Sequence, residues 1–217
     1  MAQPLAQTLY LLTYSPDKKK FELLNIQGRG QLLRGGALAE LVLGGRLGTE
    51  GGKALRLPGP PPEDPFLAEV WQDVPERPKG WLSLVHNKAH LAEAPVRGQL
   101  AEAGALTLQE GKRLKILGPS KVTVNDPEEV AALQRKVREA VLGAPDAAAI
   151  PTAELALAVL AVEVEVLSLF PHKDRREHAK ALKAAAARFD TEVPGLRQAV
   201  RASFLSSRSV GGGWGAG

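Results

Sequence analysis

The chain contains no cysteine among its 217 residues, and this absence removes several classes of site at once. A protein without cysteine has no disulfide framework, no iron–sulfur cluster, no thiolate zinc site and no cysteine nucleophile. Methionine occurs once and aromatic residues make up only 5% of the chain, although 44% of the residues are hydrophobic. That fraction allows a chain of this length to bury a substantial core. The composition therefore predicts a soluble, globular protein of the cytoplasm.

Long hydrophobic runs and targeting signals are missing too. The longest apolar run is Leu155–Val162, whereas a helix that spans a bilayer needs about 20 apolar residues. The first residues, Met1–Tyr14, contain no positively charged stretch of the kind that begins a signal peptide. We therefore expect neither a membrane span nor a secretory leader.

The net charge of +4 is distributed unevenly along the chain. Residues 1–60 carry 8 basic and 4 acidic side chains, and residues 151–217 carry 9 and 7, whereas acidic side chains are in slight excess between them. The basic residues of the first part include Lys53 and Arg56, which follow the pair Gly51-Gly52. An excess of positive charge permits an anionic partner such as a membrane surface, without identifying it.

Helical periodicity dominates the chain. Apolar spacing and capping or stop signals predict helices over residues 6–14, a second helix ending at Gly44-Gly45, and helices over 65–73, 80–90, 92–103, 127–142, 151–170, 173–188 and 194–205. Two hairpins are expected, one at residues 46–57 around Gly51-Gly52 and one at 105–117.

Residues 153–170 are apolar on nearly every face, which is typical of a helix buried at the centre of a domain. We therefore predict a mainly α fold class, with a single compact helical domain over residues 1–210 around a buried central helix, and with two β-hairpins. Residues 211–217 are mostly glycine and are expected to form a flexible tail.

The glycine-rich segment between Gly28 and Gly36 does not match the known nucleotide-binding motifs. A dinucleotide fingerprint needs a third glycine where Leu33 stands, and a phosphate loop needs lysine and a hydroxyl residue where Gly36 and Ala37 stand. No serine lies in a nucleophile elbow. We interpret the glycines as positions of close helix packing, and we predict a protein that is not an enzyme and has no cofactor.

Two histidines are the best candidates for a metal site. His86 and His90 are four residues apart, which places them on one face of the predicted helix, and Glu93 follows three residues later. Asn87, however, occupies the position where a zinc protease has its general-base glutamate. A solvated or capping role is the alternative for both histidines, and we predict no metal.

The predicted helix over residues 92–103 and the hairpin at 105–117 together have the order of a winged-helix DNA-binding motif. The hairpin contains Lys112, Arg113 and Lys115, but the helix is acidic on balance. Since a recognition helix has to approach phosphates, we expect no nucleic-acid partner and keep this function as an alternative.

The last predicted helix is basic and amphipathic. Arg197, Arg201 and Arg208 alternate with apolar residues such as Val200 and Phe204. Such a pattern is found in helices that lie on a membrane surface, and equally in helices that pack on a core and expose one charged face.

Three ordered segments resemble the Golgi phosphoprotein 3 family, which includes many bacterial members. Residues 33–47, LRGGALAELVLGGRL, resemble the arginine-glycine helix of that family and the strand that follows it. Residues 100–106, LAEAGAL, and residues 137–142, VREAVL, resemble two further family segments. The order of predicted elements agrees with the family from about Leu5 to Leu205.

The resemblance implies a mostly helical, peripheral membrane protein that binds phosphatidylinositol 4-phosphate in a basic pocket and self-associates through a protruding hairpin. One arginine of the pocket in the eukaryotic proteins has its counterpart in Arg34. The positions of two further arginines fall at His90 and Glu93, and the tryptophan position falls near Asn25. Arg34 and His90, with Arg29 as a compensating cation, are therefore the candidate headgroup-binding residues. The alternative for Arg34 is a structural role in which it pairs with a helix C-terminus.

We accordingly predict a non-enzymatic, cytoplasmic protein that associates peripherally with membranes and forms homo-oligomers through a hairpin. Its ligand would be an anionic lipid headgroup, either phosphatidylinositol 4-phosphate or an anionic lipid of bacteria. One alternative is a protein-interaction scaffold that has the fold without the lipid site, and the other is the winged-helix nucleic-acid binder.

Overall fold

Helices account for most of the structure. The computed structural model describes residues 3–22, 26–109 and 121–210, and within these ranges it contains ten α-helices and three two-stranded antiparallel sheets. The helical elements are α1 (Leu5–Leu12), α2 (Ile26–Leu43), α3 (Pro65–Asp73), α4 (Trp81–His86), the short 3₁₀ turn η1 (Ala89–Leu91), α5 (Glu93–Glu102), α6 (Pro127–Leu142), α7 (Thr152–Glu163), α8 (His172–Glu177), α9 (Ala179–Glu192) and α10 (Leu196–Val210). The predicted mainly α fold class is confirmed.

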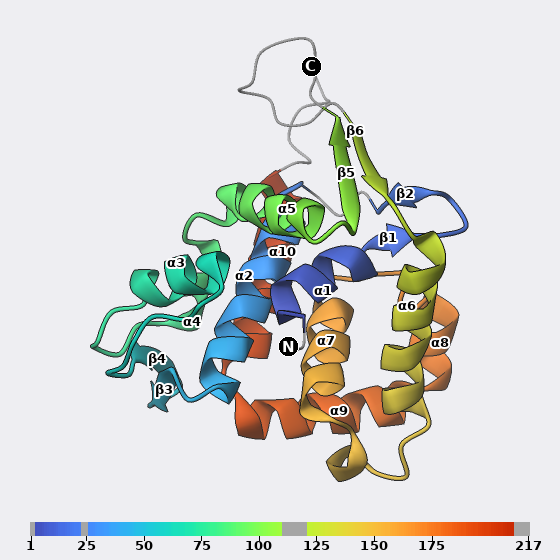
Figure 1. The fold of residues 1–217 in the computed structure, drawn as a ribbon. Helices are drawn as coiled ribbons and strands as arrows, with labels where there is room; N and C mark the ends of the chain where they lie inside the picture. Colours follow the sequence, from blue (N-terminus) through green and yellow to red (C-terminus); the bar gives the residue numbers. More distant parts are fainter. Residues whose placement is uncertain (1–2, 23–25, 110–120, 211–217) are drawn as a thin grey trace, which may run out of the picture.

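Helix α7 lies at the centre of the bundle, with α1, α2, α6, α9 and α10 packed around it (Figure 1). Its residues from Glu154 to Ala161 are all buried, which confirms the predicted central helix. The helix ends at Glu163, earlier than predicted, and Glu165 has a left-handed backbone with φ of 61°. Beyond that end the chain is irregular, but Val166 and Phe170 are still buried in the core. Their burial accounts for the apolar residues that follow the helix.

Helix α2 approaches its neighbours closely because it has glycine at the points of contact. A Cβ atom at Gly35 would lie 2.8 Å from Cγ2 of Val200 in α10, and one at Gly36 would lie 2.5 Å from Cδ1 of Leu9 in α1. Real Cβ atoms do not approach other atoms so closely, so only glycine fits without rearrangement. The interpretation of these glycines as sites of close helix packing is confirmed.

The predicted hairpin around Gly51-Gly52 is present. Strands β3 (Leu47–Glu50) and β4 (Lys53–Arg56) pair with Glu50 opposite Lys53. Both glycines have positive φ, 54° and 71°, as a tight two-residue turn requires. A short additional sheet of β1 (Tyr14–Ser15) and β2 (Lys20–Phe21) does not follow from the sequence analysis.

The second hairpin has a different partner strand from the one predicted. Strand β5 (Leu106–Gln109) pairs with β6 (Lys121–Val124), not with residues 113–117. Leu106 lies opposite Val124, and both side chains are buried, so the core-facing residues determine the pairing. The predicted turn, and the segment with Lys112, Arg113 and Lys115, lie outside the described residues.

Two of the predicted helices are each divided in two. The helix expected over residues 80–90 breaks between α4 and η1, because Lys88 adopts a left-handed backbone with φ of 51°. His86 and His90 therefore do not share one helix face, and the spacing that suggested a metal site is not realised. The helix expected over residues 173–188 likewise breaks between α8 and α9.

Helix α10 packs on the core, so the membrane-surface alternative for it is wrong. Val200 and Phe204 are buried, while Arg197 pairs with Asp190 at 2.7 Å and with Glu163 at 2.8 Å. Hydrogen bonding to Asp190 raises the pKa of Arg197.

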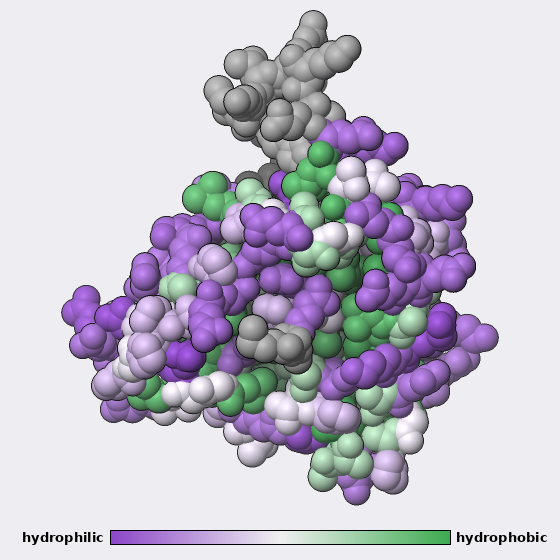
Figure 2. Space-filling view, viewed as in Figure 1, coloured by the Kyte–Doolittle hydropathy of each residue, from purple (hydrophilic) through white to green (hydrophobic). Residues whose placement is uncertain are grey.

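No helix of the described ranges is long and apolar enough to cross a bilayer. The face in Figure 2 is mainly hydrophilic, with apolar residues in small separate areas.

Candidate anion-binding site

Arg34, the matched arginine of the resemblance, is a buried residue in the middle of α2. Only 1% of its side chain is exposed, its Nε donates to the carbonyl oxygen of Leu84 at 3.0 Å, and its Nη1 lies 3.1 Å from Oδ2 of Asp73. Burial lowers the pKa of Arg34, and the charge of Asp73 opposes that shift. In this arrangement the guanidinium group links α2 to α3 and α4.

Asp73 lies between a buried and an exposed cation. Its Oδ2 accepts from Arg34, and its Oδ1 accepts from Nζ of Lys88 at 2.9 Å. The hydrogen bond to Asp73 raises the pKa of Lys88. Lys88 also approaches Glu69 at 3.6 Å. Both cations are therefore already paired with carboxylates of α3.

Arg29 and His90 do not take part in the ion pair of Arg34 with Asp73. Arg29 pairs with Glu93 at 3.0 Å, and its guanidinium group also lies near the rings of Tyr10 and Phe21. His90 is exposed on η1. Within the described residues, the structure brings Arg29 and Glu93 together but gives Arg29 and Arg34 no shared partner. Glu93 is thereby neutralised by an internal ion pair.

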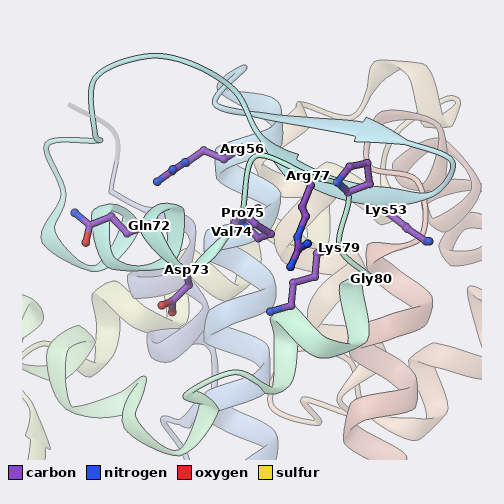
Figure 3. Close-up of a pocket in the computed structure, with 10 residues that line it drawn as sticks. Lys53, Arg56, Gln72, Asp73, Val74, Pro75, Arg77, Lys79 and Gly80 are labelled. Carbon is purple, nitrogen blue, oxygen red and sulfur yellow. The ribbon is translucent and has the colours of Figure 1, made fainter.

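A separate cavity of about 640 Å³ contains more basic than acidic side chains. We call it the basic pocket; its lining residues are Lys53, Arg56, Gln72, Asp73, Val74, Pro75, Arg77, Pro78, Lys79 and Gly80. The hairpin β3–β4 supplies two of its cations, and the loop between α3 and α4 supplies the other two. Figure 3 shows Arg77 and Lys79 extending in the same direction from this loop, whereas Lys53 extends away from them.

The loop that carries Arg77 and Lys79 is held against the edge of β4. The backbone N–H of Lys79 donates to the carbonyl oxygen of Ala54 at 2.7 Å, and the N–H of Ala54 donates back at 2.9 Å. The N–H of Arg56 donates to the carbonyl oxygen of Pro75 at 2.8 Å. These bonds hold the loop in an extended conformation. Pro75 and Pro78 favour that conformation, because proline cannot continue a helix.

The four cations of the basic pocket differ in their availability. The guanidinium group of Arg56 pairs with Glu76 at 3.0 Å and lies 4.8 Å from the centre of the Trp71 ring. Lys53, Arg77 and Lys79 have no side-chain ion pair or hydrogen bond to any described residue. Three uncompensated cations at one cavity attract an anion, and arginine and lysine are the usual ligands of phosphate oxygens.

Arg77 and Lys79 are the residues that the sequence analysis missed. Lys53 and Arg56 were noted as basic residues beside the first hairpin, but the loop residues were not connected with them. A local signal exists, because Arg77 and Lys79 alternate with Pro75 and Pro78 directly after a helix. Their proximity to β4 depends on the loop's backbone bonds to Ala54, which no local pattern specifies.

The described residues give little support to the metal and DNA-binding alternatives. No three histidine, aspartate or glutamate side chains come together in the described ranges. In α5, Arg97 approaches Glu93 at 3.7 Å and Gln99 donates to Asp64 at 2.7 Å. Arg97 and Gln99, which could otherwise contact DNA from this helix, are thus engaged within the protein.

Residues 5–203 match the family model of Golgi phosphoprotein 3 (GPP34). The chain belongs to this family. A search of the curated proteins finds no match. In this member of the Golgi phosphoprotein 3 family, the matched arginine is buried against α3 and α4, and three cations without an ion pair to any described residue line the basic pocket with Asp73.

Proposed function

We propose that the chain is a non-enzymatic, peripheral membrane protein that binds anionic lipid headgroups in the basic pocket. The observation that carries the proposal is a group of three cations, Lys53, Arg77 and Lys79, that line a cavity of about 640 Å³ and have no ion pair with any described residue. Family membership supports it, since the proposed ligand class is the one that the resemblance implies. The ligand is a phosphate-bearing headgroup, either phosphatidylinositol 4-phosphate or another anionic phospholipid.

The magnitude of the attraction is sufficient for reversible binding. Each lysine or arginine close to an anionic membrane surface contributes about 1 kcal/mol. Three such residues would favour anionic over neutral membranes by about a hundredfold, because about 1.4 kcal/mol corresponds to a factor of ten. Screening by salt reduces this preference, so binding should weaken as the ionic strength rises.

The proposal assigns different roles to the candidate residues. Arg77 and Lys79 contact the headgroup, and Lys53, which extends away from them (Figure 3), adds positive charge at the edge of the pocket. Arg34 acts as a positioning residue because it holds Asp73 at the wall of the pocket. Arg29 stabilises Glu93 and the start of α5. His90 lies on the exposed surface of η1, where it can approach a membrane without belonging to the pocket.

The combined substitution Arg77→Gln and Lys79→Gln should weaken binding to anionic vesicles about tenfold or more. It removes two of the three unpaired cations while leaving polar side chains on the exposed loop. The measurement is co-sedimentation with phosphatidylcholine vesicles that contain phosphatidylglycerol or phosphatidylinositol 4-phosphate, compared with phosphatidylcholine alone.

The matched control is Lys180→Gln with Lys183→Gln, which removes two charges from the exposed side of α9. This control should change vesicle affinity by less than about twofold, since it lies outside the pocket. Equal losses in both double variants would mean that the attraction is diffuse. Failure of the unmodified protein to prefer anionic vesicles at low salt would contradict the proposed function.

Self-association is a separate part of the proposal. The family resemblance implies a protruding hairpin, and we propose that it is the one formed by β5 and β6, whose connecting residues 110–120 lie outside the described ranges. Light scattering coupled to size-exclusion chromatography measures the mass of the particle. A monomeric mass at all concentrations would contradict this part without affecting headgroup binding.

A further inference from the structure

We propose that residues 77–92, which run from the basic pocket through α4 and η1, form a membrane-contact surface in which Leu82 and Leu91 enter the interface of an anionic bilayer. This inference rests on the proposed function, because it requires that the basic pocket faces a membrane. It goes beyond that function by assigning the surface that touches the lipid and the residues that anchor it.

The segment combines basic and apolar residues and contains no carboxylate. Its sixteen residues, RPKGWLSLVHNKAHLA, include three lysines or arginines and two histidines but no aspartate or glutamate. Among the exposed large hydrophobic residues of the described chain, Leu91 has the largest exposed fraction, 53%, and Leu82, at 45%, comes third after Leu205 at 46%. A basic surface with exposed leucine is the composition of interfacial membrane segments.

The segment is continuous with the basic pocket. Lys79 and Gly80 line the pocket, and Gly80 is the N-cap of α4, whose second residue is Leu82. A headgroup in the pocket would therefore lie within a few residues of Leu82. In Figure 1, α3, α4 and the hairpin β3–β4 occupy the same side of the molecule.

The buried face of α4 determines which of its residues lie on the exposed face. Trp81, Leu84 and Val85 are buried, and Nε1 of Trp81 donates to the carbonyl oxygen of Pro194 at 2.8 Å. The remaining positions, Leu82, Ser83 and His86, are exposed and therefore face outward from a firmly packed helix. A rigid support reduces the entropy that an anchor would lose on binding.

The carboxylates that flank the segment are paired within the protein. Glu76 pairs with Arg56, and Asp73 pairs with both Arg34 and Lys88. On the other side, Glu93 pairs with Arg29. These pairs neutralise carboxylates that would otherwise repel an anionic surface. The surface around Leu82 and Leu91 can therefore approach an anionic membrane without that repulsion.

A single exposed leucine is common on soluble proteins, so exposure by itself does not carry the inference. Leu167 provides the comparison. It is 37% exposed, but its backbone N–H donates to the carboxylate of Glu22. The connection between α7 and α8 that contains it lies on the other side of the bundle from α4 (Figure 1).

The absence of cysteine makes the test direct, because a single introduced thiol can be labelled selectively. Leu82→Cys, Leu91→Cys and, as the control, Leu167→Cys would each be coupled to the environment-sensitive fluorophore NBD. On vesicles containing phosphatidylglycerol, we expect the emission at positions 82 and 91 to rise several-fold and shift to shorter wavelength. The emission at position 167 should stay near its value in buffer.

A second measurement separates anchoring from headgroup binding. The variant with Leu82→Ala and Leu91→Ala should bind anionic vesicles about tenfold more weakly, because it removes apolar surface that the bilayer would bury. Its affinity for the water-soluble inositol bisphosphate headgroup of phosphatidylinositol 4-phosphate should equal that of the unmodified protein. Circular dichroism would establish that the variant remains folded.

The outcomes distinguish the two proposals. If the unmodified protein binds neither the soluble headgroup nor anionic vesicles, the proposed function fails and this inference fails with it. If it binds both, but the fluorophores at positions 82 and 91 respond no more than the one at 167, only this inference is overturned. Unchanged vesicle affinity of the double alanine variant would overturn it as well.

Discussion

Replacing Arg34 with methionine should lower the free energy of unfolding by about 3–5 kcal/mol, the usual cost of removing one partner from a buried ion pair. The substitution leaves Asp73, which is 12% exposed, with Lys88 as its only cation, and it leaves the carbonyl oxygen of Leu84 without its donor. Methionine preserves much of the apolar length of the side chain. The loss in the free energy of unfolding would therefore reflect the removal of the charge and its hydrogen bonds. Urea denaturation followed by circular dichroism measures it.

Arg138→Met is the matched control for this experiment. Arg138 also pairs with a carboxylate, Asp174, at 2.6 Å, but 31% of its side chain is exposed. Because this pair is partly exposed to solvent, we expect a smaller loss than for Arg34, of about 1 kcal/mol, although Arg138 also donates to the carbonyl oxygen of Leu169. Similar losses in the two variants would contradict the structural role that we assign to Arg34.

The buried position of Arg34 also affects the interpretation of binding experiments. A variant that unfolds loses vesicle binding whether or not the arginine touches a headgroup. Arg77 and Lys79 lie on an exposed, proline-containing loop, where substitution costs little stability. Those two residues therefore provide the cleaner test of headgroup binding.

Gly30→Ala should lower the free energy of unfolding by more than about 2 kcal/mol, although alanine normally favours a helix over glycine by about 1 kcal/mol. A Cβ atom at Gly30 in α2 would overlap the carbonyl oxygen of Ala89 in η1. Because that oxygen is part of the backbone, relief requires η1 to move away from α2, and overpacking of this kind costs about 1–3 kcal/mol or more. Thermal or urea unfolding measures the change.

Gly98→Ala is the control with the opposite expected sign. Gly98 lies inside α5, its φ is not positive, and a Cβ atom there would have no neighbour within 4 Å. We expect this variant to gain about 0.5–1 kcal/mol through the helix propensity of alanine. A destabilised Gly98→Ala variant, or a stable Gly30→Ala variant, would mean that the packing between α2 and η1 is looser than described.

Features that depend on neighbouring residues followed from the sequence. The pair Gly51-Gly52 predicted the β3–β4 hairpin because few other residues adopt positive φ at both turn positions. The helix predicted over residues 127–142 begins where expected, because the Asp126 carboxylate accepts from the N–H groups of Glu128 and Glu129 at the start of α6. In both cases the determining interaction is local.

Features that depend on distant contacts did not follow. The apolar residues after Glu163 are buried as predicted but are not helical, because burial specifies hydrophobicity and not backbone conformation. Lys88 divides a predicted helix, and in doing so places its ammonium group next to Asp73. The strand that pairs with β5 was also misjudged, since its register depends on the core beneath it.

By itself, the amino-acid sequence determined the mainly α fold, the buried central helix, the glycine-mediated packing of α2 and the membership of the Golgi phosphoprotein 3 family. Only the tertiary structure decided which cations are available to a ligand. Arg34 and Arg29 are neutralised by Asp73 and Glu93, which are distant in the chain, whereas Arg77 and Lys79 lie beside β4 without an ion pair to any residue that the structure describes. The physical reason is that the availability of a charge depends on which counter-charges folding brings within a few ångströms, and no local pattern specifies that.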